Sequence, residues 1–113
     1  LLNQRSQDIF VASGWNVAQY AILTHMFAQV SGLQAGELVH MISDAHIYDK
    51  HVPLCISAIS EFRKTIIGTH ELTTPLKLIM DKSITNFYDF TEDSFELEGL
   101  YEKNIMKNIP VAV

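Results

Sequence analysis

Arginine, serine and aspartate occur within four positions near the start of the chain, in the segment Arg5-Ser6-Gln7-Asp8. The planar, permanently charged guanidinium of Arg5 matches the geometry of a phosphate, and the Ser6 hydroxyl adds a neutral donor. This pairing suits a phosphomonoester. In a regular strand the two side chains point to opposite faces, so both reach one ligand only at a bulge or a strand end. The alternative is an exposed ion pair between Arg5 and Asp8.

Three further polar side chains have the chemistry to bind a nucleoside. The carboxamide of Asn16 can complement an imide edge that carries both N–H and C=O, such as that of uracil. Alternatively, Asn16 caps the N-terminus of a helix. His46 and Tyr48 are two positions apart, so an extended backbone points both to one side, where imidazole and phenol could hold a sugar hydroxyl. The alternative for these two is a half-buried polar pair in a sheet.

A metal site is a third kind of chemistry that the sequence offers. His and Asp suit zinc, manganese or iron, and a small metallohydrolase could use Asp44, His46 and His51, with Asp49 nearby. Their spacing matches no zinc motif, so we expect no metal. Cys55, the only cysteine, falls among Leu54, Ile56 and Ile59. That setting favours a small core residue over a nucleophile.

Strands and helices must position these side chains. Periodicity and turn residues predict strands over 1–11, 37–43, 76–80 and 94–100, and helices over 16–31 and from Pro53 onward. Gly32 has the residue type that ends a helix, and Pro53 fits a first helical turn. The composition of residues 63–74 predicts a loop. Residues 86–93 are rich in turn residues and predict a connection. The order is β-α-β-α-β-β. It predicts an α+β domain of layered sheet and helices spanning residues 1–113.

Composition limits the partners and the cellular setting. The chain has 113 residues, 8 basic and 13 acidic, and a net charge of −5. This balance argues against binding to DNA, other nucleic acids or an anionic membrane. No apolar run approaches the roughly 20 residues that span a bilayer. A single cysteine fits a reducing, cytoplasmic setting. Because the chain starts at Leu1 inside an apolar-led segment and without methionine, we expect a chain that has been cut into.

The motifs taken together resemble the C-terminal half of the thymidylate synthase family. The matching segments are Gln4-Arg5-Ser6-Gln7-Asp8, Trp15-Asn16-Val17-Ala18-Gln19-Tyr20 and Asp44-Ala45-His46-Ile47-Tyr48. They are similar to the family's QRSxD, FN-x-x-x-Y and DxHxY segments in order and in spacing. Further likeness comes from the loop at 32–38, from Phe87-Tyr88-Asp89-Phe90 and from the apolar end Pro110-Val111-Ala112-Val113. The resemblance covers nearly the whole chain.

The resemblance implies a methyltransferase that makes thymidylate (dTMP) from deoxyuridylate (dUMP), with 5,10-methylenetetrahydrofolate as one-carbon donor and reductant and without a metal. It implies that Arg5 and Ser6 hold the dUMP phosphate, Asn16 reads uracil, and His46 and Tyr48 bind the 3′-hydroxyl of deoxyribose. Gln4 would belong to the polar network beneath the nucleotide, and Asp8 would bind the folate pterin. A tail of Val111, Ala112 and Val113 would close over the ligands. The family forms homodimers.

One departure from the family pattern concerns the nucleophile. In the family the catalytic cysteine lies about twenty residues upstream of the position of Arg5, whereas Cys55 follows the DxHxY segment. The resemblance therefore implies a chain that binds substrate but is inactive by itself. The alternatives are a non-catalytic nucleotide-binding or dimerisation module that uses the same residues and, less favoured, the metallohydrolase.

Overall fold

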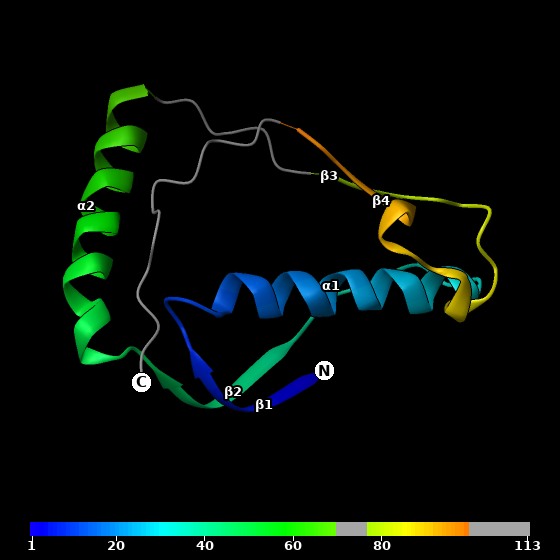
Figure 1. Cartoon of the computed structure of the whole chain (residues 1–113), viewed down its shortest axis with the longest axis horizontal. Coiled ribbons are helices and arrows are strands. Elements are labelled where there is room, and N and C mark those ends of the chain that lie inside the picture. The colour runs from blue at the N-terminus through cyan, green and yellow to red at the C-terminus, as the bar shows by residue number, and fades with distance from the viewer. Residues whose placement is uncertain (70–76, 100–113) are drawn as a thin grey trace.

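The computed structural model describes residues 1–69 and 77–99, without the side chains of 64–69. These ranges contain two α-helices and four strands, arranged as in Figure 1. They are β1 (Leu2–Asp8), α1 (Ser13–Val30), β2 (His40–His46), α2 (Val52–Thr69), β3 (Lys77–Met80) and β4 (Phe95–Glu98). Three short 3₁₀ helices, η1 (Asp49–His51), η2 (Phe87–Asp89) and η3 (Glu92–Ser94), complete the chain order. The predicted order β-α-β-α-β-β and the α+β class are confirmed.

Two separate two-stranded sheets form in the described residues. β1 pairs with β2 in parallel, and Leu2 lies opposite His40 while Asp8 lies opposite His46. The connection between the two parallel strands contains α1, as parallel pairing requires a long crossover. β3 and β4 pair antiparallel, with Met80 opposite Phe95. Both strands of the first sheet end together, and this places the residues at their ends beside one another.

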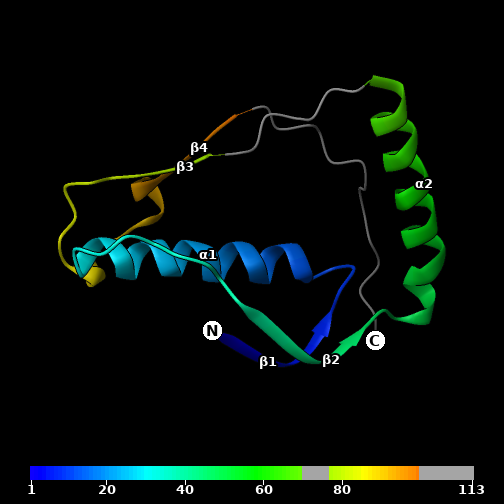
Figure 2. The same cartoon turned by 180° about the vertical axis from the view of Figure 1, so that it is seen from behind.

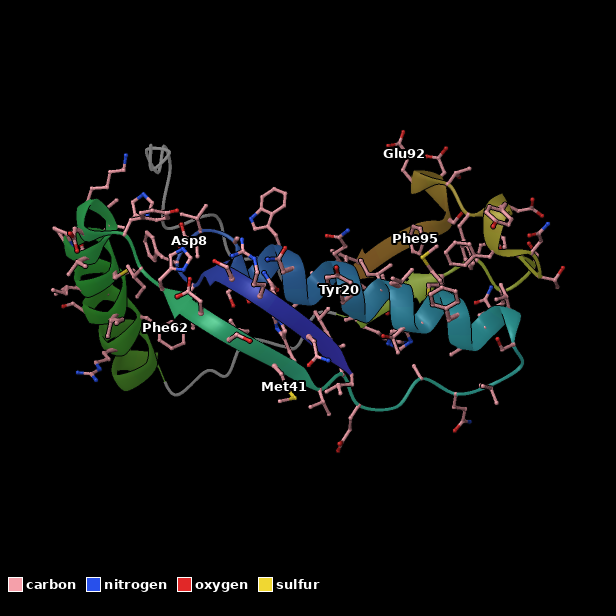
Figure 3. All side chains as sticks on the ribbon, turned by 90° about the horizontal axis from the view of Figure 1, so that it is seen from below. Asp8, Tyr20, Met41, Phe62, Glu92 and Phe95 are labelled. Atoms are coloured by element: carbon pink, nitrogen blue, oxygen red, sulfur yellow. The ribbon has the colours of Figure 1, made fainter. Side chains whose placement is uncertain are left out.

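α1 lies over the first sheet and contacts β1, and its C-terminal half contacts η2 (Figures 1 and 3). Its end is a complete Schellman motif, because Leu33 N–H donates to the Ala28 carbonyl at 2.8 Å and Gly32 N–H to Gln29 at 3.1 Å. Gly32 has the positive φ of 66° that this motif needs. The role predicted for Gly32 is therefore confirmed. Aromatic rings link α1 to η2, with Phe27 and Phe87 stacked at 4.8 Å.

α2 follows the end of the first sheet and runs across the direction of α1 in both opposite views (Figures 1 and 2). Pro53 is in its first turn, as predicted. The loop predicted over 63–74 is wrong for residues 63–69, which continue the helix, and residues 70–74 lie outside the described residues. In the part of the chain that is described, neither α1 nor α2 has the length and apolar character of a membrane-spanning helix.

Strand and helix boundaries differ from the predicted ones by a few residues. The first strand is 2–8 instead of 1–11, and the second is 40–46 instead of 37–43. α1 starts at Ser13, three residues before the predicted start, so Asn16 is not an N-cap. Ala12 occupies the cap position without a side-chain bond. The strand predicted over 76–80 is found at 77–80, and the one predicted over 94–100 is found at 95–98, because Ser94 belongs to η3 and Gly99 lies beyond the strand; residues 76 and 100 lie outside the described ones.

Candidate functional site

The C-terminal ends of β1 and β2 bring several of the predicted site residues together. Parallel pairing sets Ser6 opposite Asp44 and Asp8 opposite His46. Ligands in open α/β sheets often bind at the carboxyl ends of parallel strands. Figure 3 shows Asp8 at this end of the sheet, beside the start of α2. The sequence predicted the individual residues, and the parallel register explains why residues 38 apart in the chain form one cluster.

Asp8 ends β1 and organises the turn that leads into α1. Its Oδ1 accepts hydrogen bonds from the backbone N–H groups of Phe10 at 3.0 Å and Val11 at 3.2 Å. The Asp8 carbonyl accepts from Ala12 N–H at 3.0 Å. These bonds order the turn that precedes α1. The carboxylate is thus held in one orientation, and its Oδ2 lies 3.8 Å from Nδ1 of His51.

Ser6, Asp44 and His46 form a second group of contacts. The Ser6 hydroxyl donates to Oδ2 of Asp44 at 3.3 Å. Nδ1 of His46 lies 3.3 Å from the Asp44 carbonyl oxygen and 3.5 Å from its carboxylate. The rings of His46 and Tyr48 meet edge to face at 5.2 Å. The expectation that these two side chains share one side is consistent with this geometry, although Tyr48 lies just beyond the strand, before η1.

Gln4 bonds residues of both strands of the first sheet. Its Nε2 donates to the carbonyl of Ser6 at 2.9 Å, and its Oε1 lies 2.9 Å from Nε2 of His40. Sequence reasoning missed His40, because nothing in a single sequence signals which residue of a later strand pairs beside Gln4. Gln7, which the sequence also did not single out, is 2% exposed. Neither of its side-chain amide atoms has a hydrogen-bond partner among the residues that the structure describes.

Arg5 and Ser6 lie inside a regular strand, because the pairing register is the same before and after Arg5. No bulge therefore turns both side chains to one face, and Arg5 is exposed while Ser6 is half-buried. Asn16 is half-buried in the first turn of α1. Val111, Ala112 and Val113 lie outside the described residues.

The metal-ligand hypothesis receives no support from the described geometry. His46 lies against Asp44, whereas His51 lies against Asp8. Across residues 1–69 and 77–99 no three His, Cys, Asp or Glu side chains gather as metal ligands do. Cys55 is a free, half-buried thiol on α2.

Comparison with known proteins gives one consistent result. The model of the thymidylate synthase family matches residues 1–113. Among solved structures, the thermostable thymidylate synthase A from Bacillus subtilis is similar to this chain, with 29% sequence identity and a TM-score of 0.72. The similarity covers 95% of this chain and 36% of the Bacillus chain, so the sequence spans roughly a third of that protein. The family resemblance drawn from the motifs is confirmed, and the chain belongs to the thymidylate synthase family.

Proposed function

We propose that these 113 residues supply the nucleotide-binding part of a thymidylate synthase, which methylates dUMP to dTMP with 5,10-methylenetetrahydrofolate as cosubstrate. The observation that carries the proposal is the cluster at the ends of β1 and β2, where Ser6 and Asp8 pair in register with Asp44 and His46. Membership of the family supports the same assignment. The cluster contains donors for a phosphate and a sugar, and a carboxylate for a second ligand.

In this proposal the phosphate and the sugar of dUMP bind at the sheet end. Ser6 donates its hydroxyl to the phosphate, and the long side chain of Arg5 reaches the same anion around the edge of β1. β1 pairs only with β2 among the described strands, so that edge is open. His46 and Tyr48 hold the 3′-hydroxyl. The edge-to-face contact between their rings supports this shared role.

The base and the folate are assigned to residues around α1. Asn16 reads the imide edge of uracil and rejects cytosine, whose donor and acceptor pattern is partly reversed. Each buried polar group left unpaired costs about 1–3 kcal/mol, so the mismatch weakens binding by about 5- to 150-fold. Asp8 accepts from the folate pterin, Gln4 supports the nucleotide from below, and Val111, Ala112 and Val113 close over both ligands.

Catalysis needs a nucleophile that these residues do not provide. Cys55 lies on α2, after the segment that contains His46 and Tyr48, and so does not match the family's nucleophile. We therefore propose that the 113-residue chain by itself binds ligands without turnover. The complete enzyme acts as a homodimer in the cytoplasm, with dUMP and folate as its ligands and no metal.

Ligand titration of the 113-residue chain, followed by amide NMR, tests the binding assignment. We expect dUMP to shift the amides of Ser6, Asn16 and His46, deoxycytidylate to bind more weakly, and deoxyuridine to lose the shift at Ser6. Asn16→Ala should reduce the preference for dUMP over deoxycytidylate, while the exposed Gln19→Ala on the same helix serves as the matched control. Equal binding of dUMP and deoxycytidylate would contradict the assignment of Asn16.

A turnover assay tests the absence of a nucleophile. Methylation at C5 displaces the hydrogen there, so tritium is released from C5-labelled dUMP when the reaction proceeds. We expect no release by the 113-residue chain with methylenetetrahydrofolate. Release above the level without protein would show that the chain contains its own nucleophile, and loss of that release in Cys55→Ser would identify it.

A further inference from the structure

His51 is the most deeply buried side chain that the structure describes, with 0% of its surface exposed. It ends η1 and directly precedes α2. Its ring packs against Phe10 at 5.7 Å and against Tyr48 at 6.0 Å. None of the described apolar side chains is fully buried, so the burial of an imidazole here is unusual.

The neighbour that matters chemically is Asp8. Nδ1 of His51 lies 3.8 Å from Oδ2 of Asp8, whose side chain is only 17% exposed. Oδ1 of Asp8 already accepts two backbone hydrogen bonds, from Phe10 and Val11. The turn therefore fixes one oxygen of the carboxylate, and the buried imidazole faces the other. Only Oδ2 remains to accept hydrogen bonds from a ligand.

We propose that His51 is a positioning residue for Asp8, holding the carboxylate so that Oδ2 faces the N–H groups of the bound pterin. This inference rests on the proposed folate role of Asp8. The distance of 3.8 Å is longer than a hydrogen bond, so in the ligand-free chain the imidazole restrains the carboxylate by close polar contact. A carboxylate held in this way loses less rotational freedom when a ligand binds.

Three substitutions separate this role from simple packing. In His51→Asn the side-chain amide nitrogen takes roughly the place of Nδ1, so a donor toward Asp8 is kept. His51→Gln shifts the donor to roughly the place of Nε2, and His51→Phe keeps the ring volume without any donor. A positioning role predicts that Asn retains folate binding best, whereas a packing role predicts that Phe does.

The experiment measures two affinities in the full 113-residue chain, dUMP alone and then tetrahydrofolate in the presence of saturating dUMP. We expect His51→Phe and His51→Gln to weaken tetrahydrofolate binding about five- to tenfold, as for one lost polar contact to a charged group, and to change dUMP binding less than twofold. His51→Asn should stay within about twofold for both ligands. Equal loss of both affinities, or better retention by Phe than by Asn, would overturn the role of His51.

A measurement without any substitution keeps the test independent of folding. In the unaltered chain saturated with dUMP, the imidazole ¹⁵N resonances of His51 should shift further when tetrahydrofolate is added; no further shift at tetrahydrofolate saturation would overturn the inference. Failure of the proposed function gives a different result. If dUMP binds but tetrahydrofolate does not, or if Asp8→Asn leaves tetrahydrofolate affinity unchanged, the folate role of Asp8 is wrong and this inference falls with it.

Discussion

Asp44 connects two residues that we assign to different parts of the nucleotide. Its carboxylate accepts from the Ser6 hydroxyl at 3.3 Å and lies 3.5 Å from Nδ1 of His46. A phosphate that binds to Ser6 must therefore compete with a carboxylate for the same hydroxyl proton, and the two anions repel each other. Single-sequence reasoning treated Asp44 only as part of a motif and as a candidate metal ligand.

Replacing this carboxylate should strengthen phosphate binding. We expect Asp44→Asn to increase the affinity for dUMP relative to deoxyuridine by about two- to fivefold, the modest effect of a solvent-exposed charge. The gain should shrink at high salt because the repulsion is screened. Calorimetry of both ligands at two salt concentrations measures the ratio, and the exposed Asp49→Asn in η1 is the control. An unchanged ratio would mean that Asp44 does not face the phosphate.

Gln7 offers a separate test at the level of one side chain. It is 2% exposed, and its amide lacks hydrogen-bond partners within the described residues. A buried unpaired polar group costs about 1–3 kcal/mol, so Gln7→Met, with similar volume and no amide, should raise the free energy of unfolding by about that amount. Urea denaturation checks this, with the exposed Gln34→Met as control. Destabilisation by Gln7→Met would show that the amide has a partner.

At the scale of elements, some boundaries followed from local chemistry and others did not. Gly32 predicted the end of α1, since the Schellman motif depends on a residue that tolerates positive φ. The start of α1 was predicted wrongly: the helix begins at Ser13, directly after a turn that the Asp8 carboxylate holds through the amides of Phe10 and Val11. β2 lies three residues later than predicted, since pairing with β1 rather than residue type decides where it runs. Tertiary contacts override local preference in both cases.

One side chain of α1 bonds the loop that follows β3. Nε2 of Gln29 donates to the carbonyl of Asp81 at 2.8 Å and to that of Ile84 at 2.9 Å. Gln29→Glu keeps the shape but removes both donations, and we expect a loss of about 1–3 kcal/mol for the two bonds. Amide hydrogen exchange in β3 and β4 should accelerate, whereas Gln19→Glu on an exposed face of α1 should leave it unchanged. Unchanged exchange in Gln29→Glu would show that other contacts hold the sheet.

The turn after β3 gives an expected pH effect. The Ser83 hydroxyl donates to Oδ1 of Asp81 at 2.7 Å and the Ser83 amide at 2.8 Å. These bonds lower the pKa of Asp81 below 3.8, because they favour the charged carboxylate. Because the pKa of Asp81 is lower in the folded state, the two bonds from Ser83 stabilise the protein at pH values above the unfolded-state pKa. This stabilisation is lost as the pH falls through the folded-state pKa. Ser83→Ala should raise the pKa of Asp81, measured by carboxyl ¹³C NMR, and an unchanged pKa would show that the amide alone suffices.

At the scale of the whole molecule, the described apolar side chains are largely uncovered. Trp15 is 80% exposed, Phe27 52% and Ile56 64%, and none of the described apolar residues is buried. α1 bears apolar residues around its whole circumference, a pattern typical of a helix surrounded by other elements. The sequence predicted which residues are apolar. The sequence could not predict what covers these side chains, because their burial depends on surfaces beyond the described elements. The expectation of a single domain over 1–113 stays a prediction.

An exposed apolar surface of this kind should drive association between copies of the chain. We expect the weight-average mass in sedimentation velocity to rise with concentration and the association to strengthen on warming, since burial of apolar surface is entropically driven near room temperature. Trp15→Gln should weaken the association if the N-terminal part of α1 is the contact, whereas Tyr88→Gln in η2, which packs beside the C-terminal half of α1, should not. A monomer at every concentration would contradict the expectation. An equal effect of both substitutions would instead indicate non-specific clustering, and a saturating dimer that loses stability only in Trp15→Gln would favour a defined interface.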